Sequence, residues 1–436
     1  MQNKILKHPI FYLFLACFFE ILMLSYCRNK LGYYTGPLVL FLISMAIGIF
    51  PLLLFSSKTI NDKVVVLKTI DKHTAYAIIL FCAFFILFLF VPRGGIINIY
   101  KNFLVEVHTS DIIPTIQVMC QRLLNHYPIY VSIEQFGYHL PTTYMPFMWM
   151  PYLIAEKFHF DYRYITLLIF VIGIIFILFI TVKKTNKGLF LVLLYAFLLL
   201  AFADKNSETF GWTVEFMNGT YYSILALTFF VDNKYVKVIA LVACLLSRYS
   251  LVVFVPLYFL IEWNENGFKK TSIFALLTLA LMVVFLVPLV RNNWIELYNG
   301  YKYYTISGLG EWNHTDSNGL PLHIFNGNGF VAWIYSFKNG SIEERFAFAK
   351  SLHFILISST TMLLTLIYYK FKDSINNKVF LLCSLKIYLA VFYGFIQVPY
   401  TYLFVVPAMY SIVLLFLTNN IYYNNLVELK SVNEIE

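Results

Sequence analysis

Long apolar runs recur along the whole chain and are separated by short segments that carry lysines. The run "AYAIILFCAFFILFLFVP", residues 75–92, contains no charged residue. An apolar helix of roughly 20 residues crosses the ~30 Å hydrocarbon core of a bilayer, so runs of this kind predict membrane spans. We place spans at residues 9–26, 34–55, 75–92, 164–182, 188–203, 212–231, 236–247, 249–262, 272–290, 351–369, 379–396 and 399–418.

The lysines between these runs predict which side of the membrane each loop faces, because cytoplasmic loops carry an excess of Lys and Arg. The relevant segments are residues 56–74, with Lys58, Lys63, Lys68 and Lys72, and "KKTNK" (183–187), "DNKYVK" (232–237), "GFKK" (267–270) and "KFKDSINNK" (370–378). Twelve crossings, within a range of 11–13, place all of these segments and both termini in the cytoplasm. The predicted fold is an all-α polytopic integral membrane protein.

This topology leaves two long segments on the outer face, residues 93–163 and 291–350. The chain then divides into two N-terminal spans with a cytoplasmic loop (1–74), a core that holds the first outer segment (75–290), the second outer segment (291–350), and C-terminal spans with a tail (351–436). Residues 142–158 are apolar, but Pro146 and Pro151 interrupt them, which favours a broken juxtamembrane helix over a full span. The stretch "GLGEWNHTDSNGLPLHIFNGNG" (308–329) has no helical or strand period and predicts a loop.

Composition supports the membrane assignment and argues against several classes of function. Of 436 residues, 60% are hydrophobic and 13% are charged, whereas about 25% charged is usual in soluble proteins. The formal charge of +9 lies largely in the loops between spans, so topology explains it better than nucleic-acid binding. The six cysteines include no close pair, and no P-loop or dinucleotide fingerprint occurs. No cleavage site follows residues 10–26, so we expect this run to remain as the first span.

Ionisable residues inside apolar runs are rare in membrane proteins, and each one is a candidate functional group. Glu215 and Arg248 lie near the outer ends of predicted spans, while Glu20 and Lys386 lie deeper. Asp111 belongs to the first outer segment, just before the stretch "IIPTIQVMCQRLL". The topology therefore brings Asp111, Glu215 and Arg248 to the same face of the membrane.

A carboxylate and a cation at the same face of a membrane are suited to group transfer from a lipid phosphate. A carboxylate can take a proton from an attacking hydroxyl, and a nearby cation can hold a phosphate and stabilise it as a leaving group. Sugar transfer from a polyprenyl-phosphate donor needs these two roles and an apolar groove for the lipid tail. It needs no nucleotide-binding domain.

The order of short motifs after Asp111 resembles the GT-C glycosyltransferases, and most closely their polyprenyl-phosphate-dependent, mannosyltransferase-like bacterial branch. The acid is followed by "LLNHYPIY" (123–130), "YHLPTTYMPFMWMP" (138–151) and a long apolar run. Members of that family carry a catalytic Asp or Glu in the first large external loop, then a Pro-Tyr pair and a Tyr/Pro-rich juxtamembrane helix. The resemblance implies that Asp111 is the catalytic acid, that Pro128 and Tyr130 form the pair, and that Tyr144 and Pro146 belong to the helix.

Downstream motifs extend the resemblance over roughly residues 75–420. "EFMNGTYYSILAL" (215–227) is similar to a polar span of the family, with Asn218 as the clearest match, and "CLLSRYSLVVFVPLYF" (244–259) has Arg248 where the family usually has Lys. "VPYTYLFVVP" (398–407) is similar to the closing span and contains Tyr400 and Tyr402. Two extra spans precede the core, and Ser110 replaces the second acid of many members, so a metal-binding pair is not predicted.

The resemblance implies an inverting glycosyltransferase of a bacterial cytoplasmic (inner) membrane with a periplasmic active site. Asp111 would be the general base toward a lipid-, glycan- or protein-linked acceptor. The donor substrate would be a polyprenyl-phosphate-linked sugar, and no other cofactor or metal ion is predicted. The predicted phosphate ligands are Arg248, Arg122 and Arg163, and the predicted substrate pocket contains Tyr130, Tyr144, Asn218, Tyr400 and Tyr402.

Several of these residues have plainer alternative roles. Asp111 could cap the following helix, where a carboxylate is favourable; Glu106 or Glu215 would then be the alternative acid. Glu215 and Arg248 could form a structural ion pair, and Lys386 could be the buried partner of an acid instead of a phosphate ligand. The Pro128, Tyr130, Tyr144 and Pro146 group could simply anchor an interfacial helix, since Tyr is enriched at that depth.

Two rival functions also fit a chain with about a dozen spans. An O-antigen or capsule polymerase would depend on arginines of the outer loops, and the second outer segment offers only Arg291 and Arg345, which counts against this function. A flippase or transporter of polysaccharide lipids would show paired halves with broken helices in matching positions. No internal duplication is visible along this chain, which favours the transferase.

Overall fold

The computed structural model describes residues 9–55, 96–181, 206–290 and 294–433, together with parts of 75–86 and 198–203. Regular structure within these residues is helical, and two isolated β-bridges join Ile133 to Leu140 and Thr315 to Pro321. The predicted spans 75–92 and 188–203, and the lysine-bearing loops at 56–74 and 183–187, lie wholly or mostly outside the described residues. The predicted all-α membrane protein is confirmed in its coarse form.

The helices fall into three groups along the chain. The first part contains α2 (Pro9–Phe55), α4 (Ile96–Asn102), α5 (Ile112–Leu124), α6 (Pro146–Trp149), the 3-10 turn η1 (Met150–Tyr152), α7 (Leu153–Phe158) and α8 (Arg163–Thr181). The middle part contains α10 (Ser207–Trp212), α11 (Glu215–Thr228), α12 (Lys234–Leu245), η2 (Tyr249–Phe254), α13 (Val255–Asn266) and α14 (Phe268–Val290). The last part contains α15 (Trp294–Asn313), α16 (Leu322–Phe325), α17 (Val331–Phe337), α18 (Ile342–Phe371), α19 (Asn377–Gly394), η3 (Thr401–Phe404) and α20 (Val405–Asn433).

Five helices in the described part are long and apolar enough to cross a membrane. They cover Lys30–Leu54, Phe268–Val290, Ile342–Phe371, Asn377–Gly394 and Thr401–Tyr422. Each coincides with a span predicted from sequence. The last two are mostly buried inside the bundle, whereas only 11% of the apolar window of Phe268–Val290 is buried, as expected for a helix whose apolar surface faces lipid. The chain is therefore a membrane-associated helical protein.

The N-terminal pair of predicted spans is a helical hairpin. Glu20 and Ser44 both contact the Nζ atom of Lys386, at 2.8 and 2.6 Å. In one straight helix these two residues would lie roughly 36 Å apart, at about 1.5 Å per residue. The chain must therefore fold back between them, and Gly32, midway along, adopts φ 74° and ψ 170°, a backbone conformation outside the helical region. The predicted break between 9–26 and 34–55 is confirmed.

Three helices in the middle of the chain are too short to cross a bilayer, and α11 is also shorter than the span predicted at residues 212–231. The 14-residue α11 and the 12-residue α12 and α13 are roughly 21 and 18 Å long, less than the ~30 Å of hydrocarbon. Lys237 near the start of α12 pairs with Glu262 near the end of α13 at 2.6 Å, so α12 and η2–α13 run antiparallel with Arg248 at their tip. Twelve full-length spans are not found in the described residues, because these three helices are short and because parts of the predicted spans 75–92 and 188–203 lie outside the described residues.

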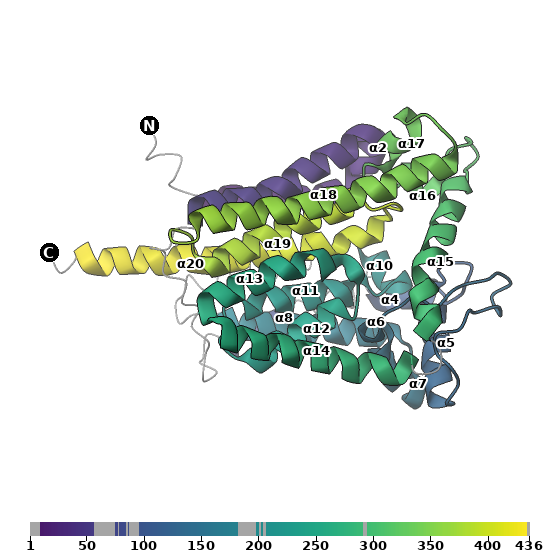
Figure 1. Cartoon of the computed structure of the whole chain (residues 1–436), viewed down its shortest axis with the longest axis horizontal. Helices are drawn as coiled ribbons and strands as arrows, with labels where there is room; N and C mark the ends of the chain where they lie inside the picture. Colours follow the sequence, from purple (N-terminus) through teal and green to yellow (C-terminus); the bar gives the residue numbers. More distant parts are fainter. Residues whose placement is uncertain are drawn as a thin grey trace.

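The segments outside the long helices gather at one end of the bundle (Figure 1). This end, which we call the loop end, carries α4–α7, α10 and α15–α17, and α15 lies across it; α2 begins and α20 finishes at the opposite end. Residues 146–158 form three short pieces, with Pro146 at the first position of α6 and Pro151 in η1. The predicted broken helix is confirmed. The predicted loop at 308–329 is wrong in part, because α15 continues to Asn313 and α16 follows.

Candidate functional site

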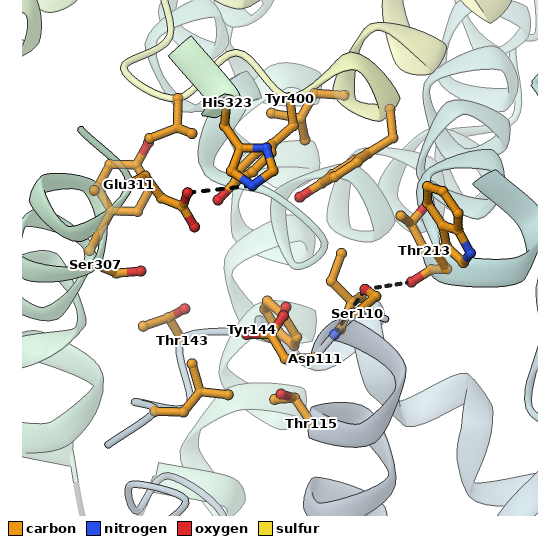
Figure 2. Close-up of a pocket in the computed structure, with 18 of the residues that line it drawn as sticks. Ser110, Asp111, Thr115, Thr143, Tyr144, Thr213, Ser307, Glu311, His323 and Tyr400 are labelled. Carbon is orange, nitrogen blue, oxygen red and sulfur yellow. Dashed lines mark hydrogen bonds and ion pairs between the residues drawn. The ribbon is translucent and has the colours of Figure 1, made fainter. Parts of the chain in front are cut away.

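A cavity of about 680 Å³ opens at the loop end, within the ~300–1,000 Å³ typical of ligand sites. Its walls come from the first outer segment, from α15 and α16, and from the start of the last span (Figure 2). The polar and aromatic residues that line it are Thr109, Ser110, Asp111, Thr115, Tyr138, Thr143, Tyr144, Trp212, Thr213, Arg248, Tyr303, Tyr304, Ser307, Glu311, His323, Asn326, Tyr400, Thr401 and Tyr402. Since Thr401 and Tyr402 belong to a candidate membrane span, the cavity reaches the depth at which that span ends.

Asp111 stands at the N-cap position of α5 without capping the helix through its side chain. Its carboxylate lines the cavity and accepts a hydrogen bond from the Tyr138 hydroxyl at 3.2 Å. Burial raises the pKa of Asp111, the Tyr138 hydrogen bond partly offsets this, and the charge of Glu311 raises it further. The predicted alternative, a capping aspartate, is therefore not what the side chain does. The carboxylate is free to act on a ligand.

Arg248, which lines the cavity, forms an ion pair with the buried Glu215. The helix break between α12 and η2 puts Arg248 in extended backbone conformation, and its guanidinium donates to Glu215 Oε1. The Glu215 side chain is completely buried, whereas the Arg248 side chain is 24% exposed and lines the cavity. The Nε atom of Arg248 has no partner among the described residues. This Nε atom is itself buried, so the part of Arg248 that a ligand can reach is the 24% of the side chain that is exposed.

Tyrosine rings supply much of the remaining wall. Tyr144, Tyr400 and Tyr402 line the cavity as predicted, and the rings of Tyr400 and Tyr402 stack with centroids 5.1 Å apart and an interplanar angle of 13°. Tyr138, Tyr303 and Tyr304 add three more phenols. A ring face combined with a hydroxyl suits ligands that have both an apolar face and a polar edge.

Glu311 and His323 were not predicted from sequence, although both line the cavity opposite Asp111 (Figure 2). Glu311 Oε2 lies 3.6 Å from His323 Nε2, and the His323 ring packs against Tyr400 with centroids 4.9 Å apart. One signal in the sequence could have found Glu311. Tyr304, Gly308 and Glu311 are spaced i, i+4, i+7, so they form one face of a helix.

Several predicted site residues lie elsewhere. Arg122 donates to the backbone carbonyls of Ile129, Val131 and Ser132, and so holds the turn that contains the Pro-Tyr motif. Arg163 pairs with Asp161 at 2.6 Å and donates to the carbonyls of Phe103 and Tyr100. Neither arginine lines the cavity. We therefore assign both a structural role in place of the predicted phosphate-binding role, because their donors are occupied by the protein.

Three other predicted site residues also do not line the cavity: Tyr130 and Asn218, predicted in the substrate pocket, and Glu106, predicted as an alternative acid. Tyr130 is fully buried, and its hydroxyl donates to the carbonyl of Tyr144 at 3.2 Å. Asn218 is also buried and donates to Glu215 Oε2 at 3.2 Å. Glu106 is exposed and does not line the cavity. Tyr130 supports Tyr144, which lines the cavity, and Asn218 supports Glu215, the buried partner of Arg248.

The described residues contain no group of three or more His, Cys, Asp or Glu side chains arranged to hold a metal ion. Comparisons with protein-family models, with curated proteins and with solved structures give no match to this chain. The chemistry of the cavity must therefore be argued from its own residues.

Proposed function

We propose that this protein is a GT-C-like membrane glycosyltransferase that moves a sugar from a polyprenyl-phosphate donor to a hydroxyl acceptor. One observation carries the proposal: the carboxylate of Asp111 and the guanidinium of Arg248 line the same cavity. The Asp111 side chain is half-buried and makes no capping hydrogen bond to α5. The cavity reaches the end of a candidate membrane span. The carboxylate and the guanidinium are the two groups that a metal-independent transfer from a lipid phosphate requires. The likeness of the motifs around Asp111 to the GT-C family supports the same conclusion.

In the proposed reaction Asp111 takes the proton of the acceptor hydroxyl. The acceptor oxygen attacks the anomeric carbon and forms the new glycosidic bond, while the bond from that carbon to the phosphate oxygen breaks. The electron pair leaves with the polyprenyl phosphate, whose charge Arg248 holds. Attack from the side opposite the phosphate inverts the anomeric carbon. Glu215 would keep the Arg248 guanidinium in the lining of the cavity.

The proposed location is the periplasmic face of a bacterial inner membrane, with both termini cytoplasmic. The α15 and α16 residues that line the cavity belong to the loop end, opposite the start of α2 and the end of α20 (Figure 1), and this arrangement supports the proposed orientation. The acceptor is a lipid-, glycan- or protein-linked hydroxyl compound.

A transfer assay tests the proposal directly. The purified full-length protein in lipid nanodiscs should release polyprenyl phosphate from a polyprenyl-phosphate hexose when a glycan acceptor is present. The same protein in proteoliposomes should not translocate a fluorescent lipid-linked saccharide. Translocation without transfer would instead support the flippase, and the proposed transferase would be rejected.

Replacing Tyr138 by phenylalanine should shift the pH dependence of transfer. The Tyr138 hydroxyl lowers the otherwise raised pKa of Asp111, so its loss should raise that pKa further and protonate the base at higher pH. A net hydrogen-bond contribution of about 1 kcal/mol corresponds to a shift of roughly 0.5–1 pH unit. The acid limb of the kcat/KM profile should therefore move to higher pH. Tyr127, which is 65% exposed and outside the cavity, is the matched control, and an unchanged limb in the Tyr138→Phe variant would contradict the assignment of Asp111 as base.

A further inference from the structure

The wall of the cavity opposite Asp111 carries two ionisable side chains, Glu311 and His323, that the proposed reaction does not use. Glu311 comes from α15 and His323 from α16, and Figure 2 shows both across the cavity from Asp111, with Ser307 near Glu311. The side chains of Glu311 and His323 are 27% and 38% exposed, so both are partly desolvated and still accessible to a ligand. Their 3.6 Å separation is longer than a hydrogen bond. The Tyr400 side chain also bonds Glu311, but a carboxylate has about four acceptor positions, so both groups can still bind another molecule.

The hydrogen-bond donors and acceptors of this wall match those of sugar hydroxyl groups. Glu311 offers acceptors only, whereas serine, threonine and tyrosine hydroxyls both donate and accept. Burial lowers the pKa of His323 despite the neighbouring Glu311, so its ring is neutral near pH 7 and offers one donor and one acceptor. A sugar hydroxyl also donates one hydrogen bond and accepts others. The wall can therefore satisfy several adjacent hydroxyls at once.

The charges of the described lining residues disfavour an anion at this wall. The lining contains two carboxylates, Asp111 and Glu311, and Arg248 is its sole Lys or Arg side chain. Arg248 belongs to the break between α12 and η2, not to the α15 and α16 elements that carry Glu311 and His323. A carboxylated sugar bound next to Glu311 would face like charge in a partly desolvated site, which is unfavourable. An uncharged ligand meets no such cost.

We infer that the Glu311–His323 wall binds an uncharged hexose of the acceptor and presents its reacting hydroxyl to Asp111. This inference rests on the proposed function, and it adds the acceptor's chemical class and the residues that select it. Glu311 and His323 are positioning residues here: they hold hydroxyls that do not react, while the donor phosphate occupies the Arg248 end of the cavity.

Saccharide binding in the absence of donor tests this wall. Saturation-transfer NMR on the full-length protein in nanodiscs would use methyl glucoside, methyl galactoside and methyl mannoside, with glucuronic acid as the anionic probe. At least one methyl hexoside should bind, more tightly than glucuronic acid, and Glu311→Gln should weaken that binding at least fivefold. Glu134→Gln is the matched control, because Glu134 pairs with His139 at 2.6 Å on the exposed surface outside the cavity; it should leave binding unchanged.

The inference is overturned if no methyl hexoside binds, if glucuronic acid binds more tightly, or if Glu311→Gln binds like the unmodified protein. In the transfer assay, Glu311→Gln should raise the acceptor KM at least fivefold with little change in kcat, a split that a folding defect would not produce. Binding is measured without the donor. If hexosides bind in a Glu311-dependent way but the protein transfers no sugar, the glycosyltransferase is rejected and the sugar site is retained. If the protein transfers sugar and Glu311→Gln has no effect, the sugar site is rejected and the glycosyltransferase is retained.

Discussion

Replacing Asp111 by asparagine should lower the rate of sugar transfer by about 10²–10⁴-fold, the usual contribution of a positioned general base. Asparagine keeps the size of the side chain and can still accept a hydrogen bond from Tyr138, but it cannot take the proton of the acceptor hydroxyl. The protein should therefore express and fold normally, because the Asp111 side chain does not cap α5. Transfer from a polyprenyl-phosphate hexose in nanodiscs, together with thermal unfolding, measures both effects.

Glu106→Gln is the matched control for this prediction. Glu106 lies five residues earlier, is exposed and is outside the cavity, so its amide variant should transfer sugar at the normal rate. A collapse of activity in Glu106→Gln with normal activity in Asp111→Asn would assign the base to Glu106 and contradict the proposed mechanism.

Replacing Lys386 by methionine should destabilise the folded protein by about 3–5 kcal/mol, the usual cost of removing one partner of a buried ion pair. Lys386 is completely buried in α19 and contacts Glu20 at 2.8 Å, Ser44 at 2.6 Å and the Pro407 carbonyl at 3.1 Å. It therefore joins both arms of the α2 hairpin to α20. Without it, the Glu20 carboxylate would be left buried and unpaired. Thermal unfolding in detergent should show a clear loss of stability.

Two further variants make this prediction specific to the ion pair. Lys270→Met removes an exposed lysine near the start of α14 and should leave stability nearly unchanged. Adding Glu20→Leu to Lys386→Met removes both charges and should restore most of the lost stability, since an apolar replacement of a buried pair is often close to neutral. Equal stability of Lys386→Met and the unmodified protein would show that this pair does not hold α2 to the bundle.

The apolar pattern predicted the long helices well because each of the five candidate spans depends on local composition. It also predicted the break in residues 142–158, where Pro146 and Pro151 cannot continue a helix. It overestimated the length of α11 and counted α12 as a full crossing, because helices packed inside a bundle are apolar on most faces without being long enough to span. Whether a buried helix crosses the membrane depends on its neighbours, which the sequence pattern does not contain.

The site was predicted in part for a similar reason. Asp111, Arg248, Tyr144, Tyr400 and Tyr402 line one cavity, as expected from the topology and the motif resemblance. Arg122 and Arg163 were misassigned because the carbonyls that occupy them become neighbours only after folding. The helix α15 was missed because Gly308 and Gly310 are weak helix formers. Gly308 is nevertheless required by tertiary packing, because a Cβ at this position would lie 2.7 Å from the Phe346 ring.

The most direct test of the central claim is a cryo-electron microscopy map of the full-length Asp111→Asn variant in nanodiscs with a polyprenyl-phosphate hexose. The account predicts density for the phosphate beside the Arg248 guanidinium, with the anomeric carbon facing the side chain at position 111 and the hexose inside the cavity. Donor density bound elsewhere on the bundle, or a phosphate in the cavity remote from Arg248, would contradict it.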